Sequence, residues 1–397
     1  MRRLLVLLAI PFVILTSCSD MDLRNILAQT VENAKSPQAP SGLSVAMLSV
    51  SMLHLTWTDN SANETGFKVE RSPDGTSGWT LVRDAAANTT SWNDSGLTPG
   101  TTYYYRVKAY TGMGDSTYSN AAFIATDTLK PITTITIGIG DNPTFTMGEP
   151  NVDENISSSY NASKYEITNA EFAQFIADGG YSTQSYWTAN GLAWKGSTIQ
   201  PGYWTDINFN GSNQPVVGVS WYEAAAFCNW RSAKEGLTPA YNGSGQATLS
   251  ANGYRLPTEV EWEYAAAKGA SGQAERTYAY GSGTFDPSKV VCSVSPASAT
   301  QTADVGSKST AGDTPQGMTD MSGNVWEWCS DNYQADGSIT TPSTDRYYFV
   351  DDSTSQAFLL RGGAWYRANE GYFRCAYRGY LNTNVRDYGI GFRVVRR

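Results

Sequence analysis

Between positions 41 and 127 apolar and polar residues alternate in short runs, a pattern typical of half-buried β-strands. The clearest runs cover residues 53–57, 66–71 and 102–109. Turn sequences rich in Pro, Asp and Gly separate these runs, at 72–75 and 98–100. The pattern predicts a small antiparallel β-sandwich over this part of the chain.

From about residue 128 the alternation gives way to a long region rich in Trp and Gly. Three Ser/Thr-x-x-Glu sequences, beginning at Thr168, Ser220 and Thr258, have the form of a capping box, in which two side chains satisfy free amides at a helix start. They predict helices over about 169–178, 221–235 and 259–268, the second ending at Gly236. The remainder has the character of short strands and long loops.

The first residues follow the order of an export signal. Arg2 and Arg3 precede an apolar run over 4–15 that is too short to span a bilayer comfortably, and Thr16, Ser17 and Cys18 come next. Residues 1–18 thereby resemble a bacterial lipoprotein signal peptide, which implies lipidation at Cys18. An ordinary signal peptide with an incidental cysteine is the alternative. We expect a membrane-anchored protein of the bacterial cell envelope, at the outer membrane or cell surface, with 19–39 as a linker.

Charge and rare residues narrow the chemistry further. The formal net charge is -9, which argues against a nucleic-acid partner. His54 is the only histidine and falls in the predicted sandwich. The rest of the chain therefore cannot form a histidine-dependent catalytic triad, a two-His-one-carboxylate iron site or a His-rich zinc site. The cysteines other than Cys18 are expected to be buried or structural, with their pairing open: Cys228, Cys292, Cys329 and Cys375.

Residues 40–127 resemble a fibronectin type III module. Trp57 stands at the buried tryptophan position after the second strand, and Tyr103 stands where the module has its tyrosine corner. The resemblance implies a spacer or adhesion unit, and no reactive residues stand out in it.

Residues 128–397 carry a second likeness. Seven motifs occur in sequence order: FTMG at 145–148, YEITN at 165–169, PVVGVSW at 215–221, YRLPTEVEWEYA at 254–265, GNVWEW at 323–328, RGG at 361–363 and GFR at 391–393. They resemble the formylglycine-generating, or sulfatase-modifying-factor, domain. The likeness implies an α+β fold with much irregular structure, of the C-type lectin type, following the all-β fibronectin type III sandwich.

Active members of that family oxidise a sulfatase cysteine with copper held by two cysteines between the RGG and GFR motifs. Soft thiolates are the ligands that Cu(I) requires. No cysteine occurs in 365–373, where Arg367 and either Glu370 or Gly371 occupy the approximate positions. We therefore expect neither copper nor catalytic residues, while an oxidase remains an alternative.

The family likeness also implies a structural calcium ion around the GNVWEW motif. The matching ligands are the side chains of Asp320 and Glu327 and the backbone carbonyls of Gly323 and Val325. Oxygen ligands including carboxylates suit this hard cation. The alternative is that Glu327 orders the loop without a metal.

The segment 361–393 has regular Arg and Gly positions around irregular runs of Tyr, Asn, Gly, Leu, Val and Asp. Rigid aromatics beside small polar residues are typical of binding loops. The spacing from Arg378 onward also resembles variable proteins of diversity-generating retroelements, whose randomised positions use a restricted residue set. Thr383, where Pro is usual, and Glu370, outside that set, depart from the pattern. A β-rich tail with aromatic packing is the plain alternative.

We therefore predict a lipid-anchored envelope protein whose second domain binds a protein or other surface ligand, and which retroelement diversification could vary. The candidate contact residues are Tyr366, Arg367, Asn369, Tyr377, Tyr380, Leu381, Asn382, Asn384, Asp387 and Tyr388. Tyr380 and Tyr388 are the preferred anchors, because aromatic side chains carry much of the energy of interfaces. A sulfatase-modifying oxidase and a structural envelope lipoprotein are the competing interpretations.

Overall fold

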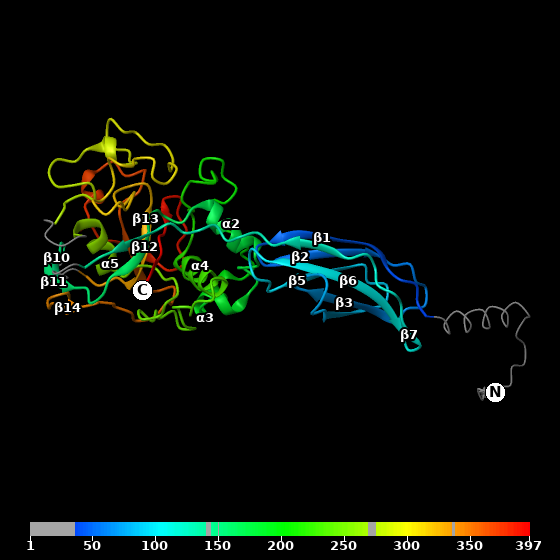
Figure 1. The fold of residues 1–397 in the computed structure, drawn as a ribbon. Helices are drawn as coiled ribbons and strands as arrows, with labels where there is room; N and C mark the ends of the chain where they lie inside the picture. The colour runs from blue at the N-terminus through cyan, green and yellow to red at the C-terminus, as the bar shows by residue number, and fades with distance from the viewer. Residues whose placement is uncertain (1–35, 140–143, 150, 269–274, 336–337) are drawn as a thin grey trace, which may run out of the picture. The chain divides into compact units, whose positions relative to one another are not determined.

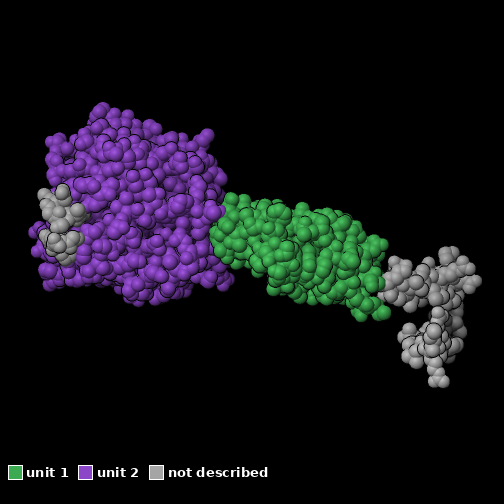
Figure 2. Space-filling model, viewed as in Figure 1, with its two compact units in different colours: residues 1–127 green, residues 128–397 purple. Residues whose placement is uncertain are grey.

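The computed structural model of the 397-residue chain describes residues 36–139, 144–149, 151–268, 275–335 and 338–397. The chain divides into two compact units, 1–127 and 128–397, coloured separately in Figure 2. No helix in the described ranges is long and apolar enough to cross a membrane. The predicted export signal and Cys18 lie outside the described residues.

The regular elements of unit 1 within residues 36–127 are all β-strands. They are β1 Ser41–Ser49, β2 Met52–Thr58, β3 Gly66–Ser72, β4 Thr80–Ala86, β5 Ser91–Ser95, β6 Thr102–Thr111, β7 Gly114–Asp115 and β8 Ala122–Ala125. One sheet has the order β1-β2-β5, and the other has β4-β3-β6-β7 with β8 also paired to β6. The predicted antiparallel sandwich is confirmed.

The core of unit 1 contains the apolar residues that the alternating pattern predicted to be buried. Trp57 is buried and its ring lies 5.8 Å from that of Phe67. The backbone N–H of Thr98 donates to the hydroxyl of Tyr103 over 3.0 Å, which is the hydrogen bond expected of a tyrosine corner. His54 is a strand residue whose ring hydrogen-bonds Asn93, so it contributes no reactive site.

Unit 2 contains three small sheets among long loops. Its strands are β9 Thr134–Ile137, β10 Thr144–Met147, β11 Val152–Asn155, β12 Tyr160–Ser163, β13 Trp326–Asn332, β14 Ser343–Thr344, β15 Ala357–Arg361, β16 Gly379–Asn382, β17 Ile390–Gly391 and β18 Val395–Arg396. The sheet orders are β10-β11-β14, β18-β12-β9 and β16-β15-β13-β17. Figure 1 shows the three strands of the first sheet, β10, β11 and β14, near one another.

The three predicted helices all begin where their capping boxes place them. They are α2 Asn169–Ala177, α4 Trp221–Lys234 and α5 Glu259–Glu263, and each has both reciprocal capping hydrogen bonds. The third is shorter than predicted, because the chain continues as a π-helical turn over Tyr264–Lys268. A further helix, α3 Ala189–Lys195, was not predicted.

The helix α4 lies in the core of unit 2, since 12 of its 14 residues are buried. Phe227 and Trp230 of α4 contact Phe175 of α2 and Phe392 near the C-terminus, with ring centres 5.4–6.1 Å apart. This aromatic core fixes the C-terminal segment to the helices. The predicted α+β fold with much irregular structure is confirmed.

Candidate functional site

Buried ion pairs fasten the C-terminal segment 361–393 to the rest of unit 2. Arg361 and Arg378 pair with Glu259 in the first turn of α5, Arg386 with Glu223 in the first turn of α4, and Arg393 with Glu327 on β13. Arg361 also pairs with Glu263. Buried charges persist only when they are paired and hydrogen-bonded, so the regularly spaced arginines act as anchors.

The residues between these anchors face outward. Residues 379–382 and 384–388 are exposed or half-buried, with Tyr380 52% exposed, whereas Arg378, Thr383 and 389–393 are buried. Thr383, which departs from the retroelement pattern, has a structural role. Its hydroxyl donates to the Ser353 carbonyl over 3.1 Å, and its own carbonyl accepts from Trp221 over 3.1 Å.

A pocket of about 230 Å³ opens beside this segment, and five of its ten lining residues are aromatic. It is lined by Trp326, Leu360, Tyr366, Arg367, Tyr372, Tyr377, Arg378, Gly379, Tyr380 and Leu381. Strands β13, β15 and β16 are neighbours in one sheet, and their order brings Trp326, Leu360 and Gly379 together. We call this cavity the aromatic pocket.

Arg367 brings an uncompensated charge to the aromatic pocket. Its guanidinium carbon lies 4.6 Å from the ring centre of Tyr372, 4.9 Å from Tyr366 and 5.7 Å from Trp326. Its Nε atom is buried without a hydrogen-bond partner, and no described Asp or Glu forms an ion pair with it. By contrast, the nearby Arg378 is neutralised by both carboxylate oxygens of Glu259.

The structure brings five of the ten candidate contact residues into the aromatic pocket, namely Tyr366, Arg367, Tyr377, Tyr380 and Leu381. Asn382 and Asn384 are exposed next to it in sequence. Asn369 is exposed and caps a short 3-10 helix, Glu370–Phe373, by accepting from the Gly371 N–H.

Asp387 and Tyr388 do not line the aromatic pocket, although the Tyr388 ring lies 5.2 Å from that of the pocket residue Tyr366. Tyr388 is half-buried in an aromatic cluster with Tyr203, Phe209 and Trp365, with ring centres 5.5–6.0 Å apart. Asp387 accepts from the Gly389 N–H over 2.8 Å. Of the two tyrosines preferred as contact residues, Tyr380 is therefore the one that the fold leaves open to a partner.

Sequence reasoning missed Trp326, Leu360 and Tyr372 as pocket residues. Trp326 belongs to the GNVWEW motif, and the pairing of strands distant in sequence brings it to the pocket. The Tyr372 ring lies 4.9 Å from that of Tyr377, so the prediction of Tyr377 had identified the correct side of the pocket.

The four described cysteines are all free and buried. Burial raises the pKa of the Cys375 thiol to about 12, with the Glu263 carboxylate adding to this shift, and also raises the pKa values of Cys228, Cys292 and Cys329. A metal ligand or nucleophile must be a thiolate, which these environments disfavour. The aromatic pocket itself is lined by no cysteine.

The predicted calcium ligands lie in a buried region with excess negative charge. Glu327 accepts from Arg393 and from the indole N–H of Trp262, over 2.6–2.7 Å. These bonds use three of the roughly four lone-pair positions of a carboxylate. Asp320 is also buried, adopts a left-handed φ of 57°, and accepts from the Gly306 N–H over 2.6 Å.

Glu166, which sequence reasoning did not assign, adds a third carboxylate there. Its Oε2 atom is buried without a hydrogen-bond partner, and its pKa is raised by burial and by the charge of Asp320. Three carboxylates thus face the single guanidinium of Arg393, a charge balance that suits a divalent cation. No three His, Cys, Asp or Glu side chains in the described ranges converge as a metal site, so a calcium ion would need the predicted carbonyls too.

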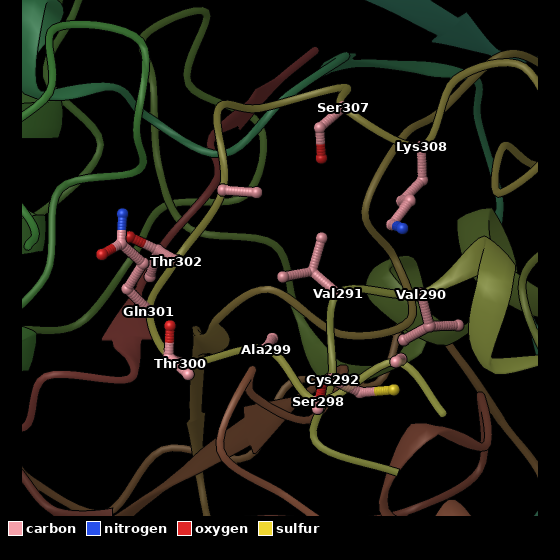
Figure 3. A pocket seen from close by; sticks show the side chains of 12 residues that line it. Val290, Val291, Cys292, Ser298, Ala299, Thr300, Gln301, Thr302, Ser307 and Lys308 are labelled. Carbon is pink, nitrogen blue, oxygen red and sulfur yellow. The ribbon is translucent and has the colours of Figure 1, made fainter. Parts of the chain in front are cut away.

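A second cavity, of about 450 Å³, lies elsewhere in unit 2 (Figure 3). Ser307 and Lys308 lie across it from the segment Ser298 to Thr300. Its lining consists mainly of small aliphatic and hydroxyl side chains, and burial raises the pKa of its one thiol, Cys292. It therefore offers little reactive chemistry.

Comparisons with known proteins agree with the two predicted likenesses. Residues 125–397 match the family model of the sulfatase-modifying factor enzyme 1-like domain, and residues 38–125 match that of the fibronectin type III domain. Both resemblances are thereby confirmed.

Curated relatives include enzymes and a chaperone. The chain is 30% identical to hercynine oxygenase from Mycolicibacterium smegmatis, over 59% of this chain and 52% of that protein, so it spans about half of that relative's length. It is 28% identical to formylglycine-generating enzyme from Streptomyces coelicolor, over 57% of this chain and 74% of that protein. It is 30% identical to chaperone protein LppX from Paenibacillus barcinonensis, over 49% of this chain and 75% of that protein.

Solved structures with a similar chain path include Treponema denticola variable protein 1, with a TM-score of 0.48 and 23% identity over 66% of this chain and 94% of that one. PvdO from Pseudomonas aeruginosa gives a TM-score of 0.45 and 21% identity over 67% of this chain and 92% of that one.

Proposed function

The chain belongs to the sulfatase-modifying factor enzyme 1-like domain family through residues 125–397, and from this premise we propose that it is a ligand-binding member of the family. Its binding surface consists of the aromatic pocket and the exposed residues of 379–388. The protein acts at the bacterial cell envelope, where a lipid at Cys18 holds it and unit 1 serves as a spacer.

One observation carries this proposal. Where the family likeness places copper-binding thiolates, this chain has Arg367 in an aromatic pocket, while its four described cysteines are buried elsewhere in the fold. A guanidinium cannot replace a soft, anionic metal ligand, because it has no lone pair to donate. Aromatic rings and arginine are, however, the side chains that dominate binding energy at interfaces.

The arrangement of exposed residues also supports a display role. Side chains between Arg378 and Arg386, apart from the buried Thr383, can change without disturbing the ion pairs at either end, since they are exposed or half-buried. Diversification by a retroelement is the finer proposal. A neighbouring reverse transcriptase gene and a near-copy of the DNA for 361–393, differing at adenines, would support it, and their absence would count against it.

The binding proposal is tested by screening the purified protein against displayed random peptides and a glycan array. Ligands found in this way are then measured against two alanine variants. Tyr380→Ala truncates an exposed side chain at the rim of the pocket, and Ile207→Ala truncates an even more exposed apolar side chain outside it. We expect the first to weaken binding about tenfold or more and the second to leave it unchanged. Equal affinities for the two variants would contradict the assigned surface.

The oxidase interpretation is tested with Cu(I) loading followed by aerobic incubation with a sulfatase-motif peptide. An active formylglycine-generating enzyme serves as the positive control. We expect no formylglycine, and any turnover that requires copper would overturn the binding-only proposal. Lipid anchoring is tested separately by labelling cells with radioactive palmitate, which the intact protein should incorporate and the Cys18→Ser variant should not.

A further inference from the structure

We propose that the aromatic pocket receives a carboxylate group from an extended acidic peptide segment of a partner protein, and that Arg367 binds it. This inference rests on the proposed binding function and names the chemical class of the ligand. It follows from the charge of the pocket, from its size, and from the free edge of the neighbouring strand.

Arg367 differs in its ion pairing from the other arginines of the segment. Five of the six arginines in 361–393 form ion pairs with Glu side chains, and Arg367 is the exception among these fully described residues. Its Nε atom is buried and has no hydrogen-bond partner. The guanidinium has no ion-pair partner among the described residues, so a ligand carboxylate that reaches its accessible nitrogens would neutralise it.

The walls of the pocket favour a planar anion. Three aromatic rings lie within 5.7 Å of the guanidinium carbon, so the Arg367 group sits among flat surfaces. A carboxylate can approach a guanidinium edge-on with two parallel hydrogen bonds, which keeps both groups in one plane. A phosphate would bring about two negative charges to a pocket with one free cation, because Glu259 already neutralises Arg378.

The size of the pocket indicates one side chain rather than a cofactor. Its volume of about 230 Å³ lies below the roughly 300–1,000 Å³ of pockets that hold drug-sized ligands. A short acidic side chain or a chain terminus would fit, with the rest of the ligand continuing outside. The surrounding rings would exclude water and strengthen the ion pair.

The strand β16 offers a place for that continuing backbone. It is the terminal strand in the order β16-β15-β13-β17, and three of its residues line the pocket. Leu359 pairs with Tyr380 and Leu360 with Gly379 on the β15 side, which leaves the opposite edge of β16 without a neighbouring strand among the described elements. A free strand edge pairs readily with an extended peptide, whose alternate side chains then enter adjacent pockets.

The test uses an array of pentapeptides with blocked ends and a central Asp, Glu, Asn or Gln, the flanking positions being varied. A second set has a free C-terminal carboxylate and no acidic side chain, so the two sources of the carboxylate are distinguished. We expect binding to be confined to peptides that carry a carboxylate in one of the two positions, and to weaken with added salt.

Fluorescence anisotropy with the selected peptides then compares three variants. Arg367→Gln should lose at least tenfold in affinity, and Arg367→Lys should retain only part of it, because lysine keeps the charge without the planar fork. Arg396→Gln is the matched control, since Arg396 also lies over a tyrosine, Tyr254, has an unpartnered Nε, and lies outside the pocket lining. It should bind as the unmodified protein does. Thermal unfolding of each variant establishes that it is folded.

Selection of neutral peptides as readily as acidic ones, or unchanged affinity in Arg367→Gln, would overturn the carboxylate inference. The same holds if no peptide of the array binds. The proposed function would survive each of these results if ligands from the random screen still depended on Tyr380 and not on Ile207. Failure of that dependence would instead remove the binding surface itself.

Discussion

Replacing Glu259 with Gln should destabilise unit 2 strongly, because one carboxylate pairs with two of the arginines that anchor the segment 361–393. Glu259 accepts from Arg378 over 2.6 and 2.8 Å and from Arg361 over 3.1 Å. The side chains of Arg361 and Arg378 are 0% and 1% exposed, so solvent cannot replace the lost partner. Breaking a buried pair by removing one partner costs about 3–5 kcal/mol. For a unit of 270 residues, 128–397, whose unfolding entropy is about 2.1 cal/mol/K per residue, that loss lowers the melting temperature by roughly 5 to 9 °C.

Differential scanning calorimetry measures this effect, because the larger unit has the larger unfolding enthalpy and its transition can be identified. Glu149→Gln is the matched control. Glu149 also pairs with an arginine of the segment, Arg374, but the two side chains are 24% and 38% exposed, and exposed pairs contribute only about 0–1 kcal/mol. If both variants lowered the transition equally, the distinction between buried anchors and surface pairs would be wrong.

Two further predictions concern carboxylates of unit 2. Calcium at about a hundredfold excess over its Kd should raise the free energy of unfolding by about 2.7 kcal/mol. Asp320→Asn should keep this gain because it keeps a side-chain oxygen, whereas Asp320→Gly, which tolerates the φ of 57°, should lose it; identical chelator responses would exclude Asp320 as a ligand. Burial, with the charges of Glu259 and Glu261, raises the pKa of Asp331 from 3.8 to about 8. The folded state therefore holds this proton longer than the unfolded state, and stability should fall as pH rises between those two values, by up to about 1.4 kcal/mol per pH unit. Urea unfolding across this window should show a shallower decline for Asp331→Asn, and an unchanged decline would refute the assignment.

The helix starts of unit 2 could be predicted because a capping box is local. Thr168, Ser220 and Thr258 each find their Glu three residues later, and all three boxes form. The helix α3 was not predicted because its start has only one of the two hydrogen bonds of a capping box. Its N-cap Thr188 accepts from the N–H of Gly191, and a glycine at this position cannot return the second hydrogen bond that makes the pattern recognisable.

The site was only half predictable, since its members come from strands far apart in sequence. The regular arginines of 361–393 indicated fixed points, but nothing in the sequence states which carboxylates they meet. Glu259, the partner of Arg378, lies 119 residues earlier. Trp326 likewise reaches Arg367 only through the order of β13, β15 and β16. Composition found the exposed tyrosine Tyr380, and tertiary pairing decided that Tyr388 is half-buried.

The anchors also explain how this surface can vary without loss of the fold. Glu223 caps α4 by accepting from the Ser220 N–H over 2.8 Å, and the same oxygen accepts from Arg386 over 3.0 Å. The ion pairs of Arg378 and Arg386 thus fix both ends of the short stretch 379–385 to the starts of α5 and α4, so the entropic cost of ordering this loop is small. Side chains between Arg378 and Arg386 add little to this stability, apart from the buried Thr383. In the proposed binding function their identities would be free to follow the ligand, whereas Arg367, held among three rings, would set a constant requirement for charge.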